Sequence, residues 1–148
     1  WAALKWLNAQ AALTPVEAKL ETGNQRYAPG DVVKLDIDGA KYPHLTLFNL
    51  PPDGHVEFFI PDPKKPEEAK KDWSREPIRE SFKVDKPPFG AEHMVAIFSK
   101  DEISDLNAAL SGMSTPERAE ALRPVLEQAL SGHDVQIGVI DIYTGGGG

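Results

Sequence analysis

The fold is decided by the stretch from Tyr27 to Ser99, in which short apolar runs alternate with turn residues. The turns and runs are, in order, Tyr27-Ala-Pro-Gly30-Asp31, Leu50-Pro-Pro-Asp53-Gly54-His-Val56, Phe58-Phe-Ile-Pro61, Pro87-Pro-Phe-Gly90 and Met94-Val-Ala-Ile97. Proline, glycine and aspartate at such intervals are typical of tight turns, and the β-branched and aromatic residues between them favour strands. The stretch therefore predicts a mainly β fold.

The individual strands follow from the apolar pattern. Val33, Leu35 and Ile37 alternate with charged residues, which indicates a strand with one buried face. Comparable patterns predict strands at residues 16–21, 45–48, 56–60, 78–83 and 135–143. Residues 94–98 are apolar without interruption, which is typical of a central strand buried on both faces. We therefore expect about seven strands.

Before the last strand the pattern changes to that of helices. A capping box, Ser99-Lys-Asp-Glu102, and a second start signal at 114–117 precede two apolar stripes that are spaced as on helix faces. Pro124 lies inside the second stripe, so we expect it to kink or split that helix. The fold prediction is an antiparallel β-sandwich of about seven strands with a helical hairpin at 100–131 inserted before the last strand.

The composition is that of one globular domain. The chain has 148 residues, of which 41% are hydrophobic and 26% charged. We expect a linker helix at 1–13, a single domain at 14–144 and a frayed glycine tail at 145–148. The linker helix would pack on this domain or against a neighbouring one, since a chain that begins at Trp1 looks like a piece of a larger protein. Residues 61–77 are polar and contain prolines, so we expect a surface loop from which Trp73 folds back onto the sheet.

Charge and hydropathy argue against two classes of partner. The net charge is −7, and no cluster of lysine or arginine lies among aromatic residues, so a nucleic acid is not expected to bind. No apolar run approaches the roughly 20 residues of a membrane helix, and no signal-peptide pattern is present. The chain contains no cysteine, which agrees equally with a cytoplasmic and an exported bacterial protein.

The sequence contains no strong catalytic or metal-binding motif. It has no Gly-x-Ser-x-Gly, no glycine-rich phosphate loop and no calcium-loop pattern. The four histidines lack the short spacing of structural zinc sites, although His44 and His55 could face each other across the hairpin at 45–60. We therefore expect no catalytic residue, no metal and no cofactor.

Four residues are candidates for contact with a partner. The candidate Tyr27 lies at one corner of the predicted sheet, beside the turn residue Asp31, and the candidates Phe89 and His93 lie at another. Trp73 is the remaining aromatic residue that could anchor a ligand. An alternative is a small hydrolase or carbohydrate-binding domain, which would use carboxylates at Asp53, Asp62 and Glu92 beside a stacking tryptophan.

The order of these motifs is similar to that of a known family. They are Tyr27-x-x-Gly30-Asp31, a strand of the Leu45-Thr-Leu47 kind, Asp53-Gly54-x-Val56, Phe58-Phe59-Ile60-Pro61, Pro88-Phe89-Gly90 and Met94-Val-Ala-Ile97-x-Ser99. In this order residues 20–99 resemble the bacterial domain of unknown function 4384, and the helical hairpin looks like an insertion. The resemblance implies a domain that often lies C-terminal to a caspase-like peptidase domain, and it implies no catalytic residues.

Together these observations predict a module without catalytic activity of its own. A caspase-like peptidase needs a catalytic cysteine, which this chain lacks. We therefore expect an accessory or regulatory domain that binds a protein or docks on its own peptidase domain. The contact would be made by an unpaired sheet edge or by an aromatic-lined face.

Overall fold

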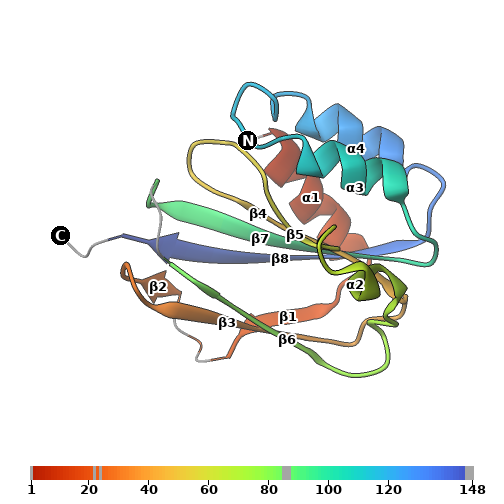
Figure 1. Ribbon diagram of the computed structural model, residues 1–148, viewed down its shortest axis with the longest axis horizontal. Helices are drawn as coiled ribbons and strands as arrows, with labels where there is room; N and C mark the ends of the chain where they lie inside the picture. Colours follow the sequence, from red (N-terminus) through yellow and green to blue (C-terminus); the bar gives the residue numbers. More distant parts are fainter. Residues whose placement is uncertain (1, 22, 24, 85–87, 146–148) are drawn as a thin grey trace.

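The computed structural model describes residues 2–21, 23, 25–84 and 88–145, and within them the chain forms two packed sheets under a layer of helices (Figure 1). The elements follow in the order α1 (Ala2–Leu13), β1 (Glu17–Leu20), β2 (Arg26–Tyr27), β3 (Val32–Asp38), β4 (His44–Leu50), β5 (Glu57–Ile60), α2 (Pro66–Lys70), β6 (Ile78–Lys83), β7 (Ala91–Ser99), α3 (Ser104–Ser111), α4 (Leu122–Leu130) and β8 (Val135–Thr144). The mainly β prediction is confirmed. The predicted glycine tail falls at 145–148, of which 146–148 lie outside the described residues, as does Trp1.

The larger sheet has the strand order β2-β8-β7-β4-β5, and the smaller one has the order β1-β3-β6. All pairs are antiparallel except the short β2, which runs parallel to β8. Each of the seven predicted strands is present. The eighth, β2, was not predicted because two residues are too few to carry an apolar period.

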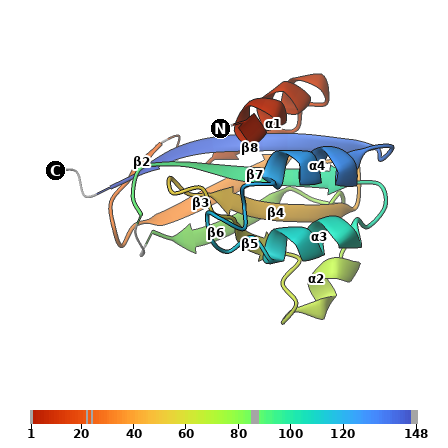
Figure 2. The same cartoon turned by 90° about the horizontal axis from the view of Figure 1, so that it is seen from above.

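The larger sheet is buried on both faces. On the face toward the smaller sheet, Leu47, Met94 and Ile140 pack against residues of β3. On the opposite face, Phe48, Val95 and Ile137 pack against the helix layer. Figure 2 shows helices α1, α3 and α4 lying across strands β8, β7 and β4. The prediction of a central strand at 94–98 that is buried on both faces is confirmed, because all of its residues are buried.

The helices differ from the prediction at their starts. Helix α3 begins at Ser104, since the Ser99 hydroxyl donates to the Asp101 carbonyl oxygen at 2.7 Å instead of capping a helix. Helix α4 begins only at Leu122, so Pro124 lies in its first turn, where the missing N–H is tolerated. The predicted loop at 61–77 contains the short helix α2, which has Pro66 at its first position.

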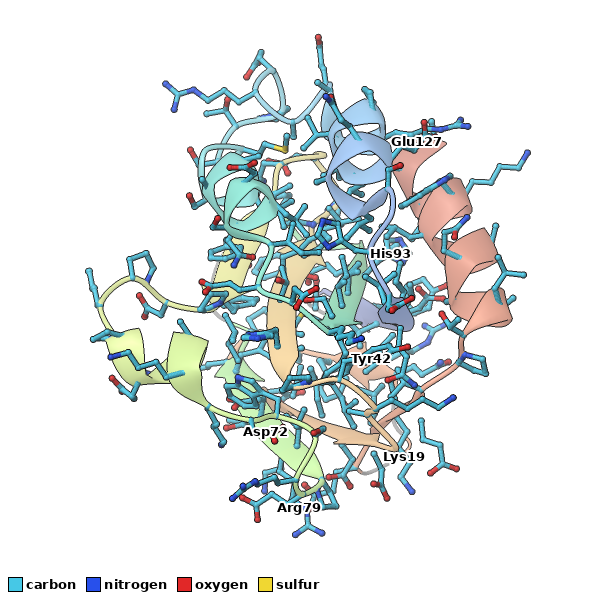
Figure 3. All side chains as sticks on the ribbon, turned by 90° about the vertical axis from the view of Figure 1, so that its right-hand side faces the viewer. Lys19, Tyr42, Asp72, Arg79, His93 and Glu127 are labelled. Carbon is cyan, nitrogen blue, oxygen red and sulfur yellow. The ribbon has the colours of Figure 1, made fainter. Side chains whose placement is uncertain are left out.

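Helix α1 lies on the larger sheet and belongs to the helix layer. Its residues contact β8 and α4, and its buried side chains Ala3 and Leu7 enter the core that α3 and α4 share with the sheet. On the far side of the molecule, Lys19 and Arg79 mark the solvent-exposed face of the smaller sheet (Figure 3). The layers are therefore helices, five-stranded sheet and three-stranded sheet.

The backbones of the two sheets approach each other closely at β1 and β8. A Cβ atom at Gly138 in β8 would lie 2.8 Å from Val16 Cγ1 and 3.2 Å from Ala18 Cβ. Glycine at this position therefore lets β1 lie directly against β8. On the other side, strands β5 and β6 are the unpaired ends of their sheets. The sandwich is closed at β1 and β8 and open at β5 and β6.

We expect Gly138→Val to lower the free energy of unfolding by about 1–3 kcal/mol, because the added side chain overlaps Val16 and forces the sheets apart. Urea denaturation followed by circular dichroism measures this change. The control is Ala91→Val, which enlarges a side chain to valine at an exposed position of the same sheet. An equal effect of the two substitutions would contradict the close approach of β1 and β8.

Candidate functional site

The open side of the sandwich contains a small cleft between β5 and β6, which we call the inter-sheet cleft. Its volume is about 180 Å³. It is lined by the apolar residues Leu47, Phe59, Ile60, Phe82 and Met94 and by the polar residues Asp62, Lys65, Glu68, Glu80 and Ser81. Half of the lining is thus apolar and half polar, and a binding site likewise combines apolar walls with polar groups that orient the ligand.

Strand β6 builds one side of this cleft through its alternation. Ile78 and Phe82 point inward and join the core between the sheets, whereas Arg79 and Ser81 are exposed. Glu80 has the same parity as the inward pair, so its carboxylate occupies a position where an apolar side chain would be expected. The strand thus directs one carboxylate toward the apolar space between the sheets.

The environment of Glu80 disfavours its charged form. Burial raises the pKa of Glu80 above the usual glutamate value, and the nearby Glu68 carboxylate adds to the rise. The positive charges of Lys71 and Lys65 lower the pKa of Glu80, but by less than burial and Glu68 raise it. Within the described residues no hydrogen bond or ion pair engages the Glu80 carboxylate. An unengaged carboxylate beside apolar walls is a group that a cationic ligand would stabilise.

Two aromatic rings connect the sheets across the cleft. Phe59 lies at the irregularity in the pairing of β5 with β4, and Phe82 lies near the end of β6. Their ring centroids are 5.9 Å apart and the ring planes differ by 25°, so the rings are stacked. Both side chains are partly exposed, and they lie 23 positions apart in the sequence. The stacked pair supplies an accessible aromatic surface at the rim of the cleft.

Two of the four predicted contact residues are buried in the structure. Tyr27 is 7% exposed and packs in the core between the sheets. Trp73 is 4% exposed, and its indole N–H donates to the Glu68 carbonyl oxygen at 3.1 Å. The expectation that Trp73 folds back onto the sheet is confirmed, and neither side chain is available to a partner in this form.

The other two predicted contact residues lie at one end of the larger sheet, away from the inter-sheet cleft. Phe89 is 37% exposed. His93 lies opposite Asp141 on the neighbouring strand, and its Nδ1 atom is 2.6 Å from the Asp141 carboxylate. The same end carries the exposed Tyr143, which pairs with Ala91. The four candidates therefore do not form one site.

The carboxylates of the alternative prediction also lie apart. Asp53 engages His55 in the turn after β4, and Asp62 lines the inter-sheet cleft. Glu92 accepts hydrogen bonds from Asn49 at 2.9 Å and from the Thr144 hydroxyl at 2.6 Å. Burial raises the pKa of Glu57 beside this network, where a hydrogen bond from Asn49 lowers it and the charge of Glu92 raises it. These groups do not converge on one pocket.

The histidines are equally separated. His44 begins β4 and pairs with Ser99, whereas His55 lies beyond the turn at the other end of that strand. The idea that they face each other across the hairpin is therefore wrong, because the register places them at opposite ends. Among the described residues, no group of three or more histidine, aspartate or glutamate side chains is arranged to hold a metal ion. The described helices also include none with the length and apolar sequence of a membrane span.

Comparison of the chain with protein-family models, with curated proteins and with solved structures found no match.

Sequence patterns alone did not identify the cleft. Phe59, Glu80 and Phe82 belong to different strands, and their contact depends on how the two sheets stack. The one signal in the sequence was Glu80, a charged residue that shares the apolar face of its strand with Ile78 and Phe82. A charge at such a position is costly, so it indicates either a sheet rim or a recognition site.

We expect Trp73→Ala to lower the free energy of unfolding by about 3–5 kcal/mol, because it removes a buried indole and its hydrogen bond. Phe89→Ala, at a partly exposed position, should change the same quantity by about 1 kcal/mol or less. Urea denaturation followed by circular dichroism compares the two. Similar values for both variants would contradict a structural role for Trp73.

We expect Glu80→Gln to raise the free energy of unfolding at neutral pH. Because the pKa of Glu80 is raised by folding, the folded state binds more protons, and stability falls as pH rises above the unfolded value of about 4.3. The substitution removes that loss, so its benefit should vanish below about pH 4, where both states hold the proton. Denaturation across this pH range tests the expectation, with the exposed Glu76→Gln as the matched control. A benefit that persists unchanged in acid would overturn it.

Proposed function

We propose that this chain is a non-catalytic accessory module that binds an extended protein segment along β6, with one side chain of that segment inserted in the inter-sheet cleft. The observation that carries the proposal is the open side of the sandwich, where an unpaired strand edge borders an aromatic-lined cleft. An unpaired edge presents backbone N–H and C=O groups that can pair with an added strand.

Strand β6 is better suited to this role than β5. It has six residues, against four in β5, and pairs with β3 on one side only. The end of β5 is followed by Pro61, and residues of α3 contact this strand. A segment paired with β6 would run alongside this strand, and alternate side chains of the segment would face the cleft beside Phe82 and Glu80.

The source of the segment follows from the resemblance to the domain of unknown function 4384. We propose that it belongs either to a neighbouring caspase-like peptidase domain of the same protein or to a separate protein partner. Either origin makes the module regulatory, since docking of the segment would change which surfaces of the partner are free. The separation of Asp53, Asp62 and Glu92 favours this proposal over the hydrolase alternative.

The test is a selection from random dodecapeptides displayed on phage, with the 148-residue chain immobilised as bait. Enriched peptides are synthesised, and their dissociation constants are measured by fluorescence polarisation. We expect Phe82→Ala and the milder Phe82→Leu to weaken binding about tenfold or more, because the partner loses a stacking surface near the centre of the contact. Phe89→Ala, a partly exposed aromatic residue away from the cleft, should leave binding unchanged.

Circular dichroism of each variant confirms that it is folded before binding is compared. A selection that enriches no peptide would refute the proposal. Enriched peptides that bind Phe82 variants as tightly as the original chain would refute the position of the site.

A further inference from the structure

We infer that the side chain accepted by the inter-sheet cleft is that of an arginine. The inference rests on the proposed function and adds the chemistry of the residue that is recognised. Three features of the cleft support it: its volume, its unengaged carboxylate and its aromatic rim.

The volume of the cleft suits one long side chain. Sites for drug-sized molecules usually measure roughly 300–1,000 Å³, whereas this cleft has about 180 Å³. A single unbranched side chain that enters from an added strand fits such a space. The cleft therefore favours a residue of a peptide over a free small molecule.

The charge of the cleft favours a cation. Three carboxylates and one lysine line it, namely Asp62, Glu68, Glu80 and Lys65. Two of the carboxylates already have partners: Asp62 accepts from the Lys64 backbone N–H at 2.9 Å, and Glu68 accepts from the Asp62 backbone N–H at 2.9 Å. Glu80 has no such partner among the described residues and points toward the apolar interior. A cation beside Glu80 would offset the cost of its burial.

The aromatic rim favours arginine over lysine. A guanidinium is planar and weakly hydrated, so it can stack on the accessible face of a ring while its N–H groups bind a carboxylate. Phe59 and Phe82 supply such rings as a stacked pair at the rim of the cleft, and Glu80 lies two residues before Phe82 on the same face of β6. An ammonium group would keep more of its water and gain less from the rings.

The experiment uses the peptides enriched by the phage selection. For each peptide, a version is synthesised in which the recurring arginine is replaced by citrulline, which has the same shape but no charge. We expect citrulline to weaken binding about tenfold or more to the original chain, because a charge-assisted hydrogen bond is lost. With Glu80→Gln the ratio of the two dissociation constants should approach one. Glu76→Gln, which removes an exposed carboxylate that does not line the cleft, should leave the ratio unchanged.

A second selection uses Glu80→Lys as bait. We expect the recurring arginine to be replaced by glutamate or aspartate at the same position of the enriched peptides, because the charge at position 80, where the carboxylate has no partner among the described residues, is reversed. A merely structural role of Glu80 would not change the preferred residue.

The outcomes separate the two proposals. Peptides that share apolar positions but no basic residue would overturn the arginine inference and leave the proposed function standing. An arginine that citrulline replaces without loss would overturn it as well, because the positive charge of that residue would then contribute nothing to binding. No enrichment at all would overturn both.

Discussion

The structure depends on the burial of strands β4 and β7 on both faces. Consecutive residues of each strand enter different cores: Leu47 and Met94 face the smaller sheet, while Phe48 and Val95 face the helices. This doubles the apolar area that the central pair removes from water, and each buried side chain contributes about 1.5–3 kcal/mol. The smaller sheet covers one of these two faces, and helices α1, α3 and α4 cover the other. The helix layer is therefore as much a part of the domain as the sandwich, although it is supplied by segments at opposite ends of the chain.

The position of the inter-sheet cleft follows from the way the smaller sheet covers the larger one. Three strands cannot cover five, and the contact at Gly138 draws β1 against β8 on one side. The opposite side is left with two strand edges and the partly exposed rings of Phe59 and Phe82. A buried core thus continues into an accessible cleft, and the carboxylate of Glu80 lies where apolar packing gives way to solvent.

Local patterns predicted the strands well because alternation and continuous apolar runs depend only on which faces are buried. They failed for β2, which is too short to show a period, and for α2, whose proline and charged residues resemble those of a loop. The prediction that His44 and His55 could face each other was wrong because it depended on the register of the β4–β5 hairpin, which local patterns do not reveal. The cleft was missed for a similar reason: Phe59 and Phe82 meet only when two sheets stack, and no pattern within either strand encodes that contact.

Because β4 and β7 contribute to both cores, binding of a ligand in the inter-sheet cleft affects the stability of the whole domain. Neither core can open without uncovering the sheet that completes the other, so the three layers form one cooperative unit. A ligand held between β5 and β6 would be released by unfolding of any layer, and its binding free energy would accordingly protect them all. Amide protons of α3 and α4, on the far side of the larger sheet, would then exchange more slowly when the cleft is filled. Binding in the cleft would thereby stabilise the helix layer on the other side of the domain without any movement of the backbone.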